Sequence, residues 1–287
     1  MTKDKFRIKL NESFSLRQGW LQKGINIVKE NGLAFKGTDA PIVFGMGSNM
    51  VKSLKYYLKV FSLTEDKKAG EVVLSEIGEC IYKYDRFLED PFSLFILHIN
   101  SLVNKYINTV AYFYFNTGSL SSATKEEIME GVKTSLENIG ENVKPQMLNN
   151  DVSVLFRNYI ETESDENPEE NAYVSPLSSL ALIKKDGGVY KKCSPKFESL
   201  DSLVVLYNIL LLTESKELTL DELLSMENNP TLALNLSESA FLYYLNDLDK
   251  NGYIRLSKTA GLNTIKILKR PNIDELYNSY RSKESVQ

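Results

Sequence analysis

The sequence predicts a mainly α-helical protein with winged-helix units, in which three helices precede a β-hairpin. Apolar residues recur at helical spacing along most of the chain. Short alternating stretches, separated by glycine and asparagine, follow two of these helical series and are typical of hairpins. A hydrophobic fraction of 43% and a charged fraction of 25% suffice for a folded core. We expect a winged-helix-like unit at 1–110, a helical middle with an acidic linker at 111–170, and a C-terminal winged helix with a β-hairpin wing at 171–287.

The first unit combines an alternating start with helices that have clear end signals. Asn31-Gly32 ends the first helix, and Asp90-Pro91 is typical of a helix N-cap followed by a first-turn proline. The elements expected in chain order are a strand at 6–10, helices at 16–31 and 48–61, a strand at 70–74, and helices at 75–84 and 92–106.

The rest of the chain predicts further helices and a second hairpin. Residues 161–170 hold six acids and a proline but no apolar residue, which indicates a solvated linker. Ala260-Gly261-Leu262-Asn263 separates two alternating stretches and predicts the turn of the wing. The other expected elements are helices at 124–139, 147–160, 200–212, 219–226 and 237–250, and strands at 253–257 and 264–268.

Charge is unevenly distributed along a chain whose net charge is −4. Residues 1–60 hold 11 Lys and Arg against 4 Asp and Glu, a net of +7, whereas residues 111–170 hold 4 against 12, a net of −8. A polyanion responds to local charge, so the N-terminal unit is the candidate binding surface. Two cysteines and one histidine rule against a Cys/His zinc site. The sequence shows neither a signal peptide nor a membrane-length apolar run, and we expect a cytoplasmic protein.

The helix expected at 48–61 is the most informative feature. Its spacing predicts one apolar face and one outward face with three lysines and a tyrosine, and no acid interrupts 45–63. Its first turn follows Gly45-Met46-Gly47 and offers backbone N–H groups to a phosphate. The alternative is a solvated helix with lysines for solubility. The candidate DNA-binding residues are Gly47, Ser48, Asn49, Lys52, Lys55, Tyr56 and Lys59.

The C-terminal unit is poorly charged for a groove of DNA. Its third helix carries Glu238, Asp247 and Asp249 against Lys250 alone. We therefore favour a protein-docking or structural role for this unit. DNA contact through the wing is the alternative, and its candidate residues are Arg255, Lys258 and Lys266.

Few residues suggest catalytic chemistry. His98 lies on an apolar helix face, which favours a core histidine. Asp85 and Glu89 stand near Asp90 in an acidic cluster and are the candidate ligands for Mg²⁺ or Mn²⁺. Helix capping by Asp90 and solvation of the other acids is the interpretation that we favour over metal binding. The catalytic residues stay unknown, and we expect no tightly bound cofactor.

Four motifs resemble one protein family. They are Phe14–Gly24, Gly45–Tyr56, Tyr84–Pro91 with its continuation to His98, and Ser175–Leu182. The sequence is similar to the SspB-like family, a domain of originally unknown function from bacterial DNA phosphorothioation and phage-defence gene clusters. In these motifs and just before them, Asn11 stands where a histidine is frequent, Ser48 where a basic residue is frequent, and Lys52 and Lys55 where arginines are usual.

The resemblance implies a function and a set of partners. We expect a DNA-binding protein of a phosphorothioation or restriction-modification type of defence system, acting as a metal-dependent nickase. The partners that the resemblance implies are double-stranded DNA and the sulfur-transfer and ATPase proteins of the same cluster. Two alternatives stay open: a non-catalytic DNA adaptor for the sulfur-transfer complex, and a transcriptional regulator, which would require a homodimer.

Overall fold

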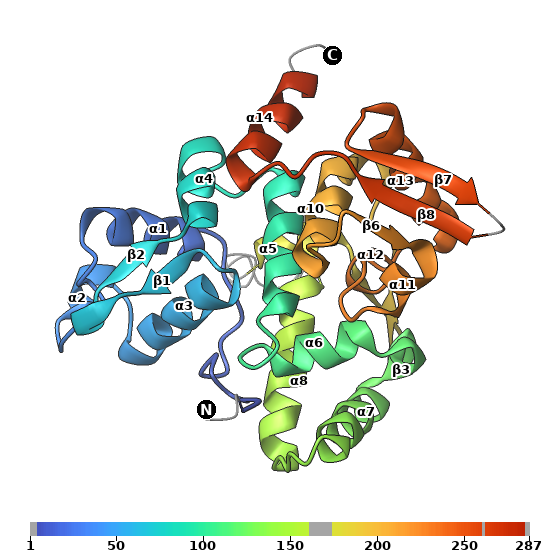
Figure 1. Cartoon of the computed structure of the whole chain (residues 1–287). Coiled ribbons are helices and arrows are strands. Elements are labelled where there is room, and N and C mark those ends of the chain that lie inside the picture. Colours follow the sequence, from blue (N-terminus) through green and yellow to red (C-terminus); the bar gives the residue numbers. More distant parts are fainter. Residues whose placement is uncertain (1–4, 161–173, 260–261, 285–287) are drawn as a thin grey trace.

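A computed structural model describes residues 5–160, 174–259 and 262–284. It is mostly helical with small antiparallel sheets, so the mainly α prediction is confirmed (Figure 1). The expected linker at 161–170 and Gly261 of the expected wing turn lie outside the described residues. Buried apolar side chains from all parts of the chain form one continuous core.

The N-terminal lobe lies on the left of Figure 1 and packs four helices together with a hairpin. Its elements are α1 (Trp20–Glu30), α2 (Ala40–Phe44), α3 (Ser48–Val60), β1 (Thr64–Asp66), β2 (Val72–Leu74) and α4 (Glu76–Tyr84). Ser75 caps α4 through its side chain. A Cβ on Gly78 would stand 2.1 Å from the carbonyl oxygen of Leu63, so only glycine lets α4 approach this closely.

The strand expected at 6–10 is wrong. The segment has no strand partner and lies instead along the start of α6, where the Arg7 N–H donates to the Tyr106 carbonyl and the Thr109 hydroxyl donates to the Arg7 carbonyl. Phe6 packs against Tyr106 at 4.8 Å between ring centroids. The alternation of apolar and basic residues therefore reflects an extended segment with one partly buried side, which does not pair with another strand.

Helix α5 (Pro91–Val103) runs through the centre of the molecule (Figure 1). Asp90 caps it, accepting a hydrogen bond from the Phe92 N–H at 2.9 Å, as the Asp90-Pro91 pair predicts. Every residue from Phe92 to Leu102 is buried. The helix thus serves as the support on which the N-terminal lobe and the remaining units pack.

The middle unit contains a sheet as well as helices. It consists of α6 (Thr109–Asn116), β3 (Ser122–Thr124), α7 (Lys125–Asn138), α8 (Pro145–Tyr159), β4 (Ile183–Asp186) and β5 (Val189–Lys192). The strand order is β3-β5-β4, so β3 pairs with a strand that lies beyond the expected boundary at residue 170. The helices expected at 124–139 and 147–160 are present as α7 and α8. The strand β3 was not expected, because a three-residue strand leaves no readable alternation.

The C-terminal unit repeats this order. It consists of α10 (Ser202–Leu212), β6 (Glu217–Thr219), α11 (Leu220–Ser225), α12 (Pro230–Ala233), α13 (Glu238–Lys250), β7 (Ile254–Thr259) and β8 (Leu262–Ile267), with strand order β6-β8-β7. In both units the first strand pairs with the last. Thr124 and Thr219 each end that first strand and begin the next helix through a capping box with Glu127 and Glu222.

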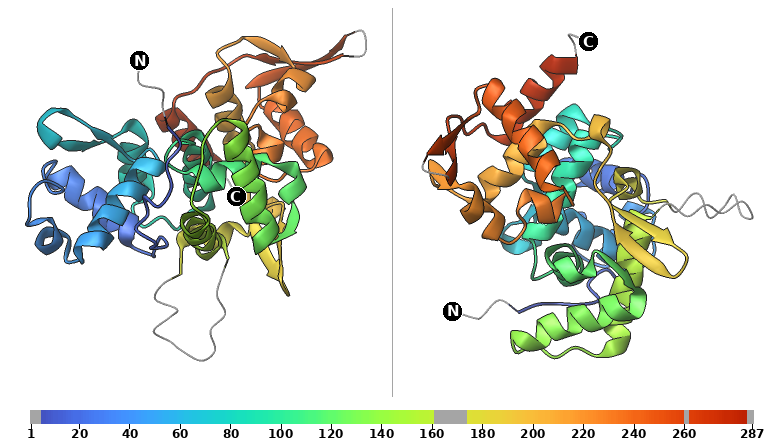
Figure 2. Two further views of the ribbon diagram at one scale, coloured as in Figure 1. Left: turned by 90° about the horizontal axis from the view of Figure 1, so that it is seen from below. Right: turned by 90° about the vertical axis from the view of Figure 1, so that its right-hand side faces the viewer.

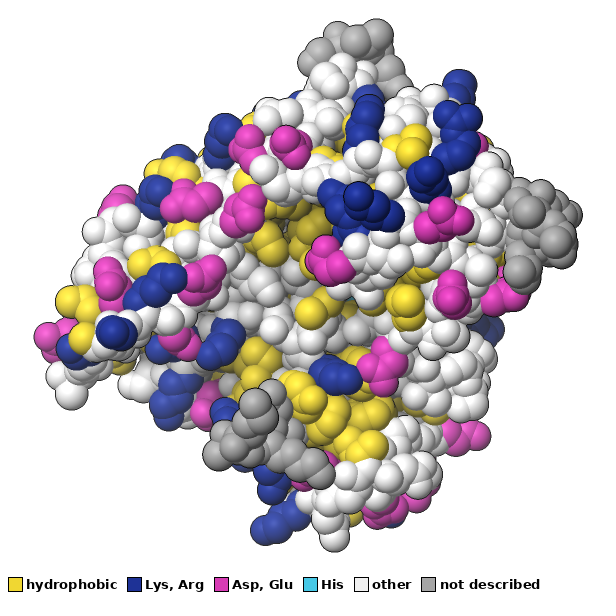
Figure 3. Space-filling view, viewed as in Figure 1, with side chains coloured by type: hydrophobic (Ala, Val, Ile, Leu, Met, Phe, Trp, Pro, Cys, Tyr) yellow, Lys and Arg dark blue, Asp and Glu magenta, His cyan; other side chains and the backbone are white. Residues whose placement is uncertain are grey.

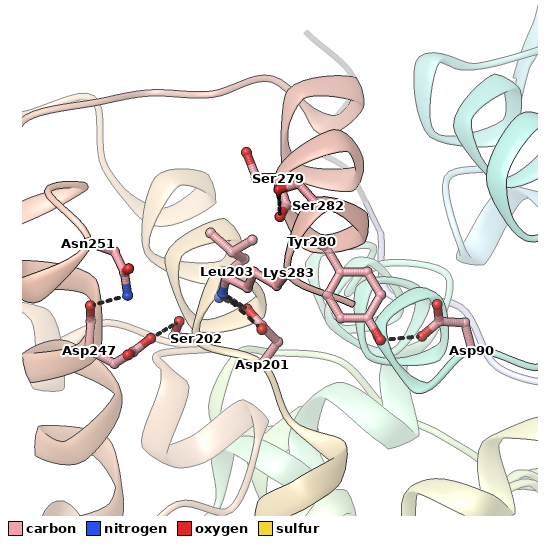
Figure 4. A network of polar contacts seen from close by, with 10 residues as sticks. All are labelled: Asp90, Asp201, Ser202, Leu203, Asp247, Asn251, Ser279, Tyr280, Ser282 and Lys283. Carbon is pink, nitrogen blue, oxygen red and sulfur yellow. Dashed lines mark hydrogen bonds and ion pairs between the residues drawn. The ribbon is translucent and has the colours of Figure 1, made fainter. Parts of the chain in front are cut away.

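Helix α14 (Ile273–Glu284) was not expected from the sequence. It contacts the residues that cap α5 and α10. Its Tyr280 hydroxyl donates to Asp90 at 3.0 Å, and Lys283 binds Asp201 at 2.9 Å (Figure 4). Because Asp90 caps α5 and Asp201 caps α10, α14 spans the starts of both helices. Short 3₁₀ turns complete the fold at Lys68–Gly70, Gly118–Leu120, Pro176–Leu180 and Phe197–Ser199.

Candidate nucleic-acid interface

The first turn of α3 is open to solvent. Gly47, Ser48 and Asn49 are exposed, and the N-cap Gly47 supplies no side-chain hydrogen bond to the turn. The first N–H groups of a helix have no partner within the helix, so this turn presents donors to an anion. Two cations lie near it: Lys52 donates to Asn49 at 3.2 Å, and Lys23 donates to the Phe44 carbonyl at 3.2 Å.

Two of the three lysines on α3 share one acid. Asp66 on β1 lies 2.7 Å from the Lys59 ammonium and 3.8 Å from that of Lys55. The hydrogen bond from Lys59 lowers the pKa of Asp66 below its usual value. The acid-free stretch at 45–63 is therefore faced by an acid from the hairpin that follows it.

The helical spacing predicted Tyr56 on the outward face with the lysines, but the structure places it elsewhere. It is half-buried, and its hydroxyl donates to the Asn108 side chain at 3.3 Å. Burial raises the pKa of the Tyr56 phenol well above 10.0. The reason is tertiary: the start of α6 covers this flank of α3, which spacing within α3 cannot reveal.

A polar cavity of about 30 Å³ lies behind α3, with room for about one water molecule. Asp151 on α8 lines it and accepts hydrogen bonds from the Lys9 N–H at 2.8 Å and the Asn11 side chain at 3.2 Å. Burial raises the pKa of Asp151 to about 6. This carboxyl group was not among the candidates from the sequence, because a single acid on an amphipathic helix carries no signal.

The loop that covers this cavity has an unusual backbone. Lys9, Glu12 and Ser13 all have positive φ, at 67°, 50° and 65°. Each such conformation costs about 1–3 kcal/mol outside glycine and persists only where the surroundings hold it. Here Asp151 holds Lys9, and Arg157 donates to the Ser13 carbonyl at 3.0 Å.

Of the two acids expected to hold a metal, Asp85 stabilises the turn that follows it. Asp85 accepts hydrogen bonds from the backbone N–H groups of Glu89 at 3.1 Å and Asp90 at 3.2 Å, and burial raises its pKa. The Glu89 side chain is exposed. Across the described parts of the chain, no three His, Cys, Asp or Glu side chains gather into a group suited to a metal ion. These residues therefore do not fit a multi-ligand metal site, and we derive no metal-dependent step from them.

His98 is a core residue, as the apolar helix face predicts. It is fully buried between Tyr159, whose hydroxyl lies 2.7 Å from Nδ1, and the Ala233 carbonyl, 2.6 Å from Nε2. A carbonyl only accepts, so Nε2 carries the proton. Burial lowers the pKa of His98 to about 4 and keeps the ring neutral.

The wing residues are placed in part. Arg255 lies 3.3 Å from Asp249 of α13 and directly opposite Lys266 in the β7–β8 register. The Lys258 side chain lies outside the described part of the protein. Asp247 of α13 is occupied by the Ser202 hydroxyl at 2.5 Å (Figure 4). Figure 3 shows Lys and Arg gathered at the upper right, over the C-terminal unit, and mixed charges over the N-terminal lobe at the left.

Comparison with known proteins decides the family. The family model described as "Protein of unknown function (DUF4007)" matches residues 10–280. The chain belongs to the DUF4007 family. No curated protein matches its sequence.

Two crystal structures of SspB show the same fold. A magnesium ion-bound crystal structure of SspB aligns with a TM-score of 0.81 at 20% identity, covering 96% of this chain and 87% of that one. A second SspB crystal structure aligns with a TM-score of 0.77 at 20% identity, covering 97% of this chain and 94% of the other. The resemblance to SspB is thereby confirmed for the fold. No helix in the described part of this DUF4007 chain is long and apolar enough to cross a membrane.

Two motifs of the DUF4007 chain lie close together although they are distant in sequence. Tyr57, which directly follows the motif Gly45–Tyr56, donates to the carbonyl of Phe14, the first residue of another motif, at 2.8 Å. Asn158 of α8 joins them, accepting from the Leu16 N–H at 2.8 Å and donating to the Tyr57 hydroxyl at 3.3 Å. Tyr56 of the second motif, the adjoining Tyr57 and Asn158 of α8 all line the polar cavity.

Proposed function

We propose that this DUF4007 protein binds DNA as a component of a DNA phosphorothioation system, and that α3 meets the phosphate backbone. The observation that carries the proposal is the uncapped, exposed first turn of α3 with Lys52 beside it. Three helices followed by the β1–β2 hairpin form the order of a winged helix, in which the third helix enters the groove of DNA. The shared fold with SspB supports the system but not the contact.

We also propose the winged-helix description for the middle and C-terminal units. Each has a helix, a strand, further helices and a hairpin, and in each the first strand pairs with the last. In the C-terminal unit, Asp247 and Asp249 on α13 disfavour DNA. We propose that this unit docks a sulfur-transfer or ATPase protein of the same system, with wing contacts to DNA through Arg255 and Lys266 as the alternative.

We further propose strand nicking, which the family resemblance supports. Nicking requires a catalytic site, and Asp85 and Glu89 do not form a multi-ligand metal site for it with the other residues that the structure describes. A magnesium ion is bound in one SspB structure. Conversion of supercoiled plasmid to open circle in the presence of Mg²⁺ or Mn²⁺, and its loss in EDTA, would support nicking. Binding without conversion would favour the adaptor.

DNA binding is tested with the unmodified full chain. Fluorescence anisotropy of a labelled duplex of about 30 base pairs, titrated at several salt concentrations, should give saturable binding that weakens as salt rises. The second alternative, a transcriptional regulator, would be supported by a stable dimer and by much tighter binding to a palindrome from the gene cluster. Absence of binding at low salt would contradict the proposed function.

A further inference from the structure

A cation-lined groove lies in the middle unit, between α8, the start of α7 and the β4–β5 hairpin. We call it the middle groove; its volume is about 260 Å³, and Lys125, Arg157 and Lys185 line it beside Ser153. Its apolar floor is Phe156 stacked on Tyr190, with ring centroids 3.6 Å apart. In the right-hand view of Figure 2, the β4–β5 hairpin is the yellow ribbon that projects beside α8.

The three cations of the middle groove have no acidic partner among the described residues. In the described ranges no acid lines the groove, and none of the three cations forms an ion pair. Lys125 donates to the Ser153 hydroxyl at 2.7 Å, and the Lys185 ammonium stands 5.8 Å from the Tyr190 ring centre. Positive charge over an apolar floor suits an anionic ligand with a flat or apolar part.

The C-terminal unit has the equivalent groove, also of about 260 Å³. Lys125 follows the capping Thr124 just as Leu220 follows the capping Thr219. Lys185 pairs with Tyr190 in one sheet as Leu256 pairs with Ile265 in the other.

The helices align in the same way. Ser153, Phe156 and Arg157 on α8 have the spacing of Leu242, Leu245 and Asn246 on α13, and all six line their grooves. The same topology thus builds two grooves, one with three cations and one whose lining has no charged side chain among the residues that the structure describes.

The C-terminal groove shows which side chains this topology tolerates at the positions of the three cations. Leu220, Asn246 and Leu256 occupy the positions of the three cations in a unit that folds in the same way. At the positions of Lys125 and Lys185 the fold therefore does not need positive charge, and burial of apolar area serves it at least as well. Arg157 also donates to the Ser13 carbonyl, so it has a structural contact besides its place in the groove. The positive charge in the middle groove therefore indicates an anionic ligand.

We infer that the middle groove holds a phosphate of a DNA strand, at a place separate from α3. The inference rests on the proposed DNA binding. The three cations would neutralise the backbone, and the Phe156–Tyr190 floor would carry the adjoining sugar or base. A winged helix that binds through its third helix and its wing would use this same place, between α8 and the β4–β5 hairpin.

The test exchanges the cations for the residues of the sister groove, as Lys125→Leu, Arg157→Asn and Lys185→Leu in one chain. The slope of log affinity against log salt for a duplex of about 30 base pairs should become shallower by about 0.9 for each phosphate that the variant no longer neutralises. The control removes three exposed lysines of the C-terminal unit, Lys196→Ala, Lys216→Ala and Lys250→Ala, and should keep the wild-type slope.

Two measurements keep the outcomes distinct. Thermal melting checks folding, and if the triple variant unfolds, the single exposed change Lys185→Leu replaces it, with a slope change of about 0.9 expected. Wild-type binding with an unchanged slope in the groove variant overturns this inference and leaves the proposed function standing. Absence of wild-type binding overturns both.

Discussion

At the scale of single residues, Asp151 links stability to pH. Its carboxyl group has a pKa of about 6 because it is buried with only two hydrogen-bond donors, whereas the unfolded chain has a value near 3.8. The folded state therefore favours the protonated acid, so its penalty is absent below pH 3.8 and complete above pH 6.

Asp151→Asn should remove this penalty. The difference in unfolding free energy between the variant and the wild type should grow in favour of the variant as pH rises from about 4 to about 7, by on the order of 1–3 kcal/mol. Urea denaturation at several pH values measures it. A difference that stays constant across this range would show that Asp151 is not held at a raised pKa.

Asp66 is the residue that most directly opposes DNA on α3. It neutralises Lys59 and Lys55 from the neighbouring hairpin. Asp66→Asn should strengthen duplex binding severalfold at low salt, because it frees two lysines and removes one negative charge near the phosphates. Stability should change by less than about 1 kcal/mol, as expected for an exposed ion pair. Glu65→Gln, on the same strand but paired with Lys67, is the matched control.

At the scale of elements, capping signals identified helices well. Asp90, Ser75 and Ser237 each cap the helix expected after them. Short strands were missed where three residues carry no period, as in β3 and β6. Helix α14 was missed because its apolar contacts are with α4 and α5, far away in sequence.

The register of α13 makes a sharp prediction. Phe241 and Leu245 are both 1% exposed, whereas their neighbour Leu242 is 39% exposed. Phe241→Ala or Leu245→Ala should each destabilise the protein by roughly 2–5 kcal/mol through reduced burial and a cavity. Leu242→Ala should cost less than about 1 kcal/mol. Equal effects of the three changes in chemical denaturation would refute this register.

At the scale of the whole molecule, α14 connects the N-terminal lobe to the C-terminal unit. Tyr277 is buried, stacks on Tyr84 at 5.1 Å and donates to the Ser93 hydroxyl at 2.9 Å. Tyr277→Ala should destabilise the chain by about 3–5 kcal/mol, as for other large aromatic truncations. Ser282→Ala, at an exposed position of the same helix, should leave the melting temperature unchanged. A Tyr277→Ala variant that melts like the wild type would mean that α14 does not hold the units together.

The family and the exposed first turn of α3 could be predicted from the sequence, whereas the polar cavity behind α3 could not. The exposed turn at Gly47–Asn49 follows from local signals, because glycine and small polar residues begin a helix there. The cavity behind Tyr56 requires Asp151 from α8 and Asn11 from the first segment, 140 residues apart. Contacts of that range follow from packing, which periodicity along one chain does not reveal.

Contact between α3 and DNA is tested by the salt dependence of duplex affinity in the triple variant Lys52→Ala, Lys55→Ala, Lys59→Ala. If α3 meets the phosphates, this variant binds every duplex sequence more weakly, with a slope shallower by up to about 0.9 for each phosphate that α3 no longer neutralises. The matched control is Lys196→Ala, Lys216→Ala, Lys250→Ala, which removes the same charge and should bind like the wild type. A folded α3 variant with the affinity and slope of the wild type would contradict the claim.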